Sequence, residues 1–213
     1  MKRRVGILIS GRGSNMEALA DACAEPSFPA ELVLVLANNP EAGGIAIAAE
    51  RGIATAVIDH RPYRRDRAAH EMAIAHRLDQ AGVELVCLAG YMRLLTPLLV
   101  GRYAGRMLNI HPSLLPSFPG RDTHVRALAA GVKIHGCTVH LVTEAMDEGP
   151  ILMQAAVPVL GDDDEDRLAH RVLAQEHRIY AQALALLATG AEGMPPDETA
   201  FLCNPLQGRP DSA

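Results

Sequence analysis

Val5-Gly-Ile-Leu-Ile-Ser-Gly-Arg-Gly-Ser-Asn15 joins an aliphatic run to a glycine-rich loop near the start of the chain. The run from Val5 to Ile9 has the near-continuous apolar character of a parallel strand that is covered on both faces. After the loop, apolar side chains recur at helical spacing at Met16, Leu19, Ala20 and Cys23. A strand, a glycine loop and an amphipathic helix in this order predict the first unit of an α/β sheet.

The same alternation continues through the first half of the sequence. Three more aliphatic runs predict strands at Leu32–Leu36, Ala54–Ile58 and Leu85–Ala89. Helical patterns fill the gaps, and one of them contains Ile74, Leu78 and Ala81 and stops before Gly82. Strands that alternate with helices predict parallel pairing through right-handed crossovers.

Beyond residue 105 the pattern changes. We expect a strand at Met107–Ile110, followed by a proline-rich loop and a helix near Val125–Ala130. Two more strands should follow at Cys137–Val142 and Ile151–Val159. A tight turn between the last two strands predicts an antiparallel pair. A long helix should run from about Asp164 to Leu187, with an acidic start that suits the positive end of its dipole. The predicted fold class is α/β: a Rossmann-like open, mostly parallel sheet with helices on both faces and a late antiparallel strand pair.

The composition is that of an ordinary globular protein. The 213 residues are 49% hydrophobic and 21% charged, which predicts one domain over 1–190 and a loosely ordered tail over 191–213. The net charge of −5 and the lack of a long Lys/Arg run argue against nucleic acid as a partner. No apolar stretch approaches the roughly 20 residues of a spanning helix, and the N-terminus runs into a strand rather than a signal sequence. We therefore expect a cytoplasmic protein with no membrane partner, and reduced, mostly buried thiols at Cys23, Cys87, Cys137 and Cys203.

The glycine loop after the first strand is the first candidate site. Gly11 and Gly13 allow the backbone to approach an anion closely, and the free N–H groups of the following helix supply donors. A plain capping box of Ser14 and Glu17 is the alternative, although capping does not need two upstream glycines. Met16 replaces the third glycine of a dinucleotide motif and no Walker motif follows, so the pattern favours a single phosphate.

A second candidate lies at the end of a later strand. Asn109 interrupts an apolar strand near its carboxyl end, where open α/β sheets place their ligands, and its amide can donate to a developing oxyanion. His111 follows just outside the strand, in a loop that three nearby prolines stiffen, which suits a proton-transfer group. Taken singly, Asn109 also fits a role at a strand-end backbone group, and His111 also fits an ordinary loop histidine.

Asp147 is the third candidate, in the expected turn of the late strand pair. A carboxylate brought beside His111 would favour the imidazolium and fix the orientation of the ring. The stretch Met146–Pro150 also fits an ordinary Asp/Gly/Pro turn. Sequence spacing does not show whether the two side chains meet.

Four motifs in this order closely resemble one family. They are Gly11-x-Gly-Ser-Asn15, Leu88-Ala-Gly-Tyr-Met-Arg-Leu-Leu95, Asn109-Ile-His-Pro-Ser-Leu-Leu-Pro116 and Asp147-x-Gly-Pro150. From about Val5 to Tyr180 the chain is similar to the folate-dependent formyltransferases, and among them to the phosphoribosylglycinamide formyltransferases of purine synthesis. The Asn-x-His and Asp set, which formyl transferases and hydrolases of this fold share, implies the chemistry, and the glycine loop implies the acceptor.

The resemblance also implies the roles of particular residues. In the catalytic centre, Asn109 contacts the formyl oxygen, His111 donates a proton and Asp147 favours the protonated histidine. The residues implied to bind glycinamide ribonucleotide are Gly13, Ser14, Asn15 and Glu176. Those implied to bind the formyl donor 10-formyltetrahydrofolate are Arg67, Met92, Arg93, Leu94, Leu95, Asn109, Glu144 and Asp147, the last two in the loop Thr143–Asp147. The expected reaction is direct formyl transfer to the glycinamide amine, with neither a metal nor a covalent enzyme intermediate.

Two of these positions have alternatives. Glu176 lies on an apolar stripe that should face inward, so it also fits a snorkelling or paired boundary carboxylate. Arg67 has Arg64 and Arg65 as neighbours, and all three also fit solvated charges at a helix start.

Two residues depart from the pattern of the family. Arg12 is a large cation in a loop where a small or uncharged residue is expected, and it either reinforces phosphate binding or points to solvent. Leu173 lies one turn before Glu176, where relatives can carry a polar residue, so we expect substrate contacts near this helix to differ.

The other histidines do not predict a metal site. His70-Glu71 with His76 lacks the spacing of a zinc HExxH motif, and His135 and His140 lack a third ligand. His140 lies on the more polar face of its strand, so we expect it to line the site instead.

Three other functions compete with this interpretation. Formyltetrahydrofolate hydrolases share the catalytic trio but normally carry an additional N-terminal domain, whereas the first strand here begins at Val5. Methionyl-tRNA formyltransferases usually carry a C-terminal extension that binds tRNA and lack the glycine loop. A non-enzymatic sugar-phosphate-binding protein would bind phosphate without any dependence on folate. The sequence leaves the oligomeric state open.

Overall fold

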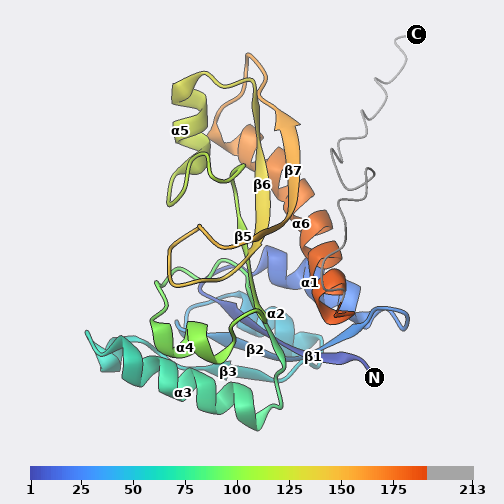
Figure 1. The fold of residues 1–213 in the computed structure, drawn as a ribbon, viewed down its shortest axis with the longest axis vertical. Helices are drawn as coiled ribbons and strands as arrows, with labels where there is room; N and C mark the ends of the chain where they lie inside the picture. The colour runs from blue at the N-terminus through green and yellow to red at the C-terminus, as the bar shows by residue number, and fades with distance from the viewer. Residues whose placement is uncertain (191–213) are drawn as a thin grey trace.

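One twisted sheet organises the molecule (Figure 1). The structure is a computed structural model that describes residues 1–190, so the expected tail over 191–213, with Cys203, lies outside the described residues. Within that range seven strands have the order β3-β2-β1-β4-β5-β6-β7. They are β1 (Arg3–Ile9), β2 (Ala30–Ala37), β3 (Thr55–Val57), β4 (Leu85–Leu88), β5 (Met107–His111), β6 (Ile134–Leu141) and β7 (Ile151–Pro158).

Helices cover both faces of the sheet. They are α1 (Ser14–Ala24), α2 (Gly44–Glu50), α3 (Arg67–Gln80), α4 (Pro97–Arg102), α5 (Thr123–Ala130) and α6 (Glu165–Ala188), with a short 3-10 helix η1 at Arg61–Tyr63. Apolar side chains of α1, α2, α5 and α6 share one buried cluster with the sheet, and those of α3 and α4 share a second cluster. Figure 1 shows α3 and α4 on the opposite side of β1 from α1 and α6. The predicted fold class is therefore confirmed.

The strand directions refine the prediction at the late end of the sheet. β1 to β5 pair in parallel, and β6 is antiparallel to β7 as expected, but it is also antiparallel to β5. The predicted tight turn is wrong, because residues 142–150 form a longer loop that folds back beside the strand ends. Asp147 in this loop has a φ of 59°, and a Cβ on Gly149 would collide with the carbonyl oxygen of Leu141. Asp147 and Gly149, which indicated a turn in the sequence, instead allow the loop to pass close to the end of its own strand.

Two smaller differences concern element boundaries. His111 is the last residue of β5 and not the first residue of the loop, so the rigid sheet itself holds its backbone. The short helix α4 was not predicted, although Thr96 caps it through a hydrogen bond from Leu98 N and Pro97 occupies its first position. A Thr-Pro pair at a helix start is a recognisable signal.

The order of the strands fixes where a ligand can bind. β1 and β4 are neighbours, while β2 and β3 extend the sheet on one side and β5 extends it on the other. The chain connections therefore leave the carboxyl ends of β1 and β4 in opposite directions and open a crevice between them. Tyr180 joins α6 to β4 and β5 below this crevice, because its buried hydroxyl donates to the carbonyl oxygens of Leu88 and Leu108 at 3.1 and 3.2 Å.

Two further sequence expectations concern the thiols and membranes. Cys23, Cys87 and Cys137 are free and buried as expected, and burial raises the pKa of the Cys23 thiol to about 11. Over residues 1–190, no helix combines the length and apolar character that crossing a membrane requires.

Candidate active site

The glycine loop after β1 ends in an open helix start. Gly13, with a φ of 87°, is the N-cap of α1 and supplies no side chain to cap it. Ser14 is already the first helical residue, and Glu17 contacts Arg51 at 3.3 Å rather than the cap. The capping-box alternative is therefore wrong, and the first N–H groups of α1 are left without a side-chain acceptor. A left-handed glycine before free helix donors forms a cradle for an anion.

An open cavity of about 240 Å³ lies over this loop. Its wall combines the loop after β1 with the loop after β4, and the lining residues are Ser10, Gly11, Arg12, Gly13, Ser14, Asn15, Ala89, Gly90 and Met92. The cavity thus occupies the crevice that the strand order defines. Arg12 is exposed at its edge, so a cation stands beside the free helix donors.

Glu176 of α6 lies next to the same loop. Its side chain is buried, and Oε2 accepts a hydrogen bond of 2.7 Å from Asn15 Nδ2. Burial raises the pKa of Glu176, and the hydrogen bond from Asn15 partly opposes that rise. The hydrogen bond confirms that Glu176 is a paired carboxylate, while its role in substrate binding stays a prediction. Asn15 Oδ1 is buried without a hydrogen-bond partner among the described residues, so it can accept one from a ligand.

The structure brings Asp147 to His111. Asp147 Oδ2 lies 3.6 Å from His111 Nδ1, and both side chains are less than a tenth exposed. The same oxygen accepts a hydrogen bond of 2.9 Å from Gly120 N, which fixes the carboxylate. On the other side of the ring, His111 Nε2 lies 3.2 Å from the carbonyl oxygen of Phe118. Both ring nitrogens of His111 thus face oxygen atoms, and these two contacts fix the orientation of the ring.

His140 of β6 completes this group, next to its strand partner Asn109. Its Nδ1 lies 2.9 Å from the carbonyl oxygen of Leu141, which can only accept, so Nδ1 carries a proton. Burial lowers the pKa of His140, with the Leu141 contact and Asp147 opposing the fall, and the neutral ring then offers Nε2 as an acceptor. Nε2 lies 3.2 Å from Asn109 Nδ2, so it binds one N–H of the amide and leaves the other N–H for a ligand.

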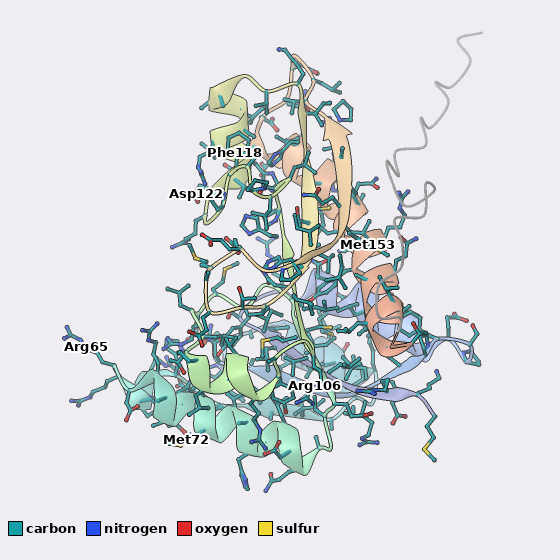
Figure 2. All side chains as sticks on the ribbon, viewed as in Figure 1. Arg65, Met72, Arg106, Phe118, Asp122 and Met153 are labelled. Carbon is teal, nitrogen blue, oxygen red and sulfur yellow. The ribbon has the colours of Figure 1, made fainter. Side chains whose placement is uncertain are left out.

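The residues expected to bind the formyl donor fall into three places. Met92 and Leu94 project from the loop after β4, with 77% and 58% of their surface exposed, and Leu95 packs against the second core cluster. Glu144 is exposed in the loop after β6. Arg67 is exposed as the first residue of α3 and does not line the cavity described above. Figure 2 shows its neighbour Arg65 projecting away from the body of the protein.

Two contributors to the site were not singled out in the sequence. Asn38, buried directly after β2, accepts a hydrogen bond of 2.7 Å from Ser10 Oγ. The carbonyl of Phe118 is the second partner of His111. An asparagine that follows an aliphatic run at the carboxyl end of a parallel strand is a signal that could have identified Asn38, whereas a backbone carbonyl leaves no such signal.

An amide, an imidazole and a carboxylate thus converge at the carboxyl edge of an open α/β sheet, beside an anion cradle. This arrangement defines an enzyme site for group transfer at a carbonyl carbon, because it supplies an oxyanion donor and an oriented proton donor. Comparisons with known proteins agree with this class. A model described as formyl transferase matches residues 3–184.

Individual relatives are similar over most of the chain. It is 43% identical over 184 residues to phosphoribosylglycinamide formyltransferase of Escherichia coli (strain K12), with 86% of each protein covered. It is 48% identical over 190 residues to trifunctional purine biosynthetic protein adenosine-3 of Bos taurus, which covers 89% of this chain. The chain spans only 19% of the length of that trifunctional relative.

Solved structures show the same likeness. A phosphoribosylglycinamide formyltransferase from Brucella melitensis is 56% identical, with a TM-score of 0.84 over 91% of this chain and 98% of that one. Glycinamide ribonucleotide transformylase 1 from Symbiobacterium toebii is 47% identical, with a TM-score of 0.86 over 89% of both chains. The chain belongs to the formyl transferase family. The expected resemblance and the expected class of enzyme are confirmed.

Proposed function

We propose that the protein transfers the formyl group of 10-formyltetrahydrofolate to the amine of glycinamide ribonucleotide, as a step of purine synthesis. One observation carries most of the proposal: Asp147, from a loop between β6 and β7, lies 3.6 Å from His111 at the end of β5. The two residues come from separate segments and meet beside the one free N–H of Asn109. The names of the Escherichia coli and Symbiobacterium toebii relatives supply the acceptor.

The anion cradle and Glu176 would bind the acceptor. Gly13 and Ser14 line the cavity at the start of α1, where backbone N–H groups can hold a phosphate, with Arg12 at the edge as an added cation. Asn15 Oδ1 is buried and unpaired among the described residues, and Glu176 lies directly behind it. The pair offers acceptor oxygens to the hydroxyl and amine groups of a ribonucleotide.

The donor would bind across the loops after β4 and β6. Met92 and Leu94 present uncovered apolar surface that can pack against a flat heterocycle. Asn109 lies in β5, paired with Leu88 at the end of β4, from which the loop with Met92 and Leu94 leaves. Glu144 and Arg67 are exposed and can reach the more distant, charged portion of a folate. Arg12, Leu173 and the choice among Arg64, Arg65 and Arg67 stay predictions of the sequence.

The residues then support direct acyl transfer. The amine nitrogen attacks the formyl carbon, a new C–N bond forms, and the bond from that carbon to N10 of the folate breaks. The free N–H of Asn109 stabilises the oxyanion that develops on the formyl oxygen. The proton lost by the amine balances the proton gained by N10, and His111, held by Asp147, sits where it can hold or pass that proton.

A formyl-transfer assay with purified protein tests the proposal. Formyl loss from 10-formyltetrahydrofolate should require glycinamide ribonucleotide and yield formylglycinamide ribonucleotide. Formate release at the same rate without the acceptor would instead indicate the hydrolase, and acceptor binding without any transfer would indicate a sugar-phosphate-binding protein.

His111→Ala supplies the matched test of the site. It should lower kcat by about 10²- to 10⁴-fold with an unchanged circular dichroism spectrum, which is the typical range for a lost acid–base group. His76→Ala, on the exposed side of α3, removes an imidazole far from the trio and should leave kcat unchanged.

A further inference from the structure

A buried carboxylate outside the catalytic group points toward the donor loop. Glu71 of α3 is only 2% exposed. Its Oε1 accepts a hydrogen bond of 2.7 Å from Thr96 N, and its Oε2 accepts one of 2.6 Å from Thr96 Oγ1. Both carboxylate oxygens are thus committed to a single residue of the loop that follows β4.

Thr96 directly follows the segment expected to bind the formyl donor. The segment Met92–Leu95 lies immediately before it, and Thr96 itself caps α4 through a hydrogen bond from Leu98 N. The other end of the segment is also fixed, because Met92 N donates to Ser10 Oγ at 2.9 Å. The segment is therefore anchored at two points, by the hydroxyl of Ser10 and by the carboxylate of Glu71.

The same carboxylate links this segment to a second donor-binding candidate. Arg67, the first residue of α3, precedes Glu71 by four positions, so the two side chains leave the same face of the helix. The helices α3 and α4 lie side by side (Figure 1). A shift of the Glu71 contact would therefore move Arg67 relative to Met92–Leu95.

A buried carboxylate is a costly residue for a purely structural contact. Glu71 lies near Tyr91, whose hydroxyl is buried without a partner among the described residues. Burial raises the pKa of that hydroxyl, Arg93 opposes the rise and Glu71 adds to it. An apolar side chain of similar size often stabilises such an interior at least as well, but it cannot fix a backbone N–H and a hydroxyl in one geometry.

We propose that Glu71 is a positioning residue for the formyl donor. Its two hydrogen bonds to Thr96 hold Met92–Leu95 in the conformation that receives the folate and align α3, with Arg67, against that segment. The inference rests on the proposed function and concerns the donor half of the site alone. Glu71 does not touch the reacting atoms, so it sets the KM for the donor and not the rate of the chemical step.

Glu71→Met and Glu71→Gln form the matched pair that tests this. Methionine keeps the length of the side chain and removes both acceptors, whereas glutamine can accept from Thr96 N and donate to Thr96 Oγ1. We expect Glu71→Met to raise the KM for 10-formyltetrahydrofolate about tenfold or more, with the KM for glycinamide ribonucleotide and kcat within about twofold of wild type. Glu71→Gln should stay close to wild type in all three constants.

Two further measurements separate positioning from a general loss of stability. Thr96→Val should raise the donor KM as Glu71→Met does, while Thr96→Ser should not, because serine keeps the hydroxyl. Hydrogen exchange of the Met92–Leu95 amides should be faster in Glu71→Met than in Glu71→Gln, and unchanged in α1.

The outcomes distinguish this inference from the proposed function. A donor KM of Glu71→Met that equals that of the wild type would overturn the inference while leaving the function in place. Equal rises in both KM values would also overturn it, since they indicate a loosened protein rather than a displaced donor segment. A wild-type protein without folate-dependent transfer would overturn the proposed function itself.

Discussion

Asp147→Asn is the substitution whose effect can be worked out most fully from the structure. Asparagine keeps the size of the side chain and tolerates the left-handed backbone at this position, where φ is 59°. Its amide oxygen can still accept the hydrogen bond from Gly120 N that Asp147 Oδ2 accepts at 2.9 Å. The substitution therefore removes a charge 3.6 Å from His111 Nδ1 and leaves the loop in place.

The size of the effect follows from that distance. Two unit charges 3.6 Å apart interact by about 4.6 kcal/mol at an effective dielectric constant of about 20, the value that best describes buried sites in proteins. Because the carboxylate stabilises positive charge that develops on the His111 ring during proton transfer, removing the carboxylate charge should lower kcat by roughly 10³-fold. The KM for glycinamide ribonucleotide should change little, because the anion cradle is built from α1.

Steady-state kinetics with both substrates, alongside a thermal melt, measures this. Glu148→Gln is the control, since it neutralises the neighbouring carboxylate, which is exposed. A kcat within about threefold of wild type for Asp147→Asn, with the fold intact, would refute the assignment of Asp147 to the mechanism.

Three other predictions concern the surrounding structure. Glu176→Gln should raise the KM for glycinamide ribonucleotide while leaving the donor KM unchanged, as initial-rate kinetics at varied concentrations of each substrate would show; equal changes in both would argue against a role in acceptor binding. The pKa of His135 falls to about 4 through burial, so between its unfolded value near 6.5 and pH 4 only the unfolded chain takes up the proton. The free energy of unfolding should therefore fall by up to about 3 kcal/mol as pH decreases over that window, and denaturant titrations should show a flatter pH dependence for His135→Phe. Tyr180→Phe removes the hydrogen bonds to Leu88 and Leu108 carbonyls and should lower the free energy of unfolding by about 1 kcal/mol; an unchanged melting temperature would contradict that contribution.

The order of elements was readable from the sequence because each parallel strand is buried on both faces. The aliphatic runs such as Val5–Ile9 and Leu85–Ala89 predicted β1 and β4, and the stripe through Met16 and Leu19 predicted the buried face of α1. The connection between β6 and β7 was misjudged, since the Asp and Gly that mark a tight turn also permit a loop that returns closely to its own strand. Turn chemistry is local, and it does not encode the length of the loop around it.

The site was predictable as a set of residue types but not as a set of contacts. Asn109 and His111 could be placed at one strand end by counting along β5. Their meeting with Asp147 depends on how residues 142–150 fold back, which no spacing reveals. His140 was expected to line the site, yet its tautomer and its bond with Asn109 follow only from the β5–β6 register.

The central claim is that Asp147 acts through His111 on one formyl carbonyl. A double-mutant cycle in kcat, with His111→Ala, Asp147→Asn and the combined variant, tests it most directly. If the two side chains act as a unit, the combined variant should be no slower than His111→Ala alone. Losses that multiply in the combined variant would show that the two residues act independently, and would contradict the account.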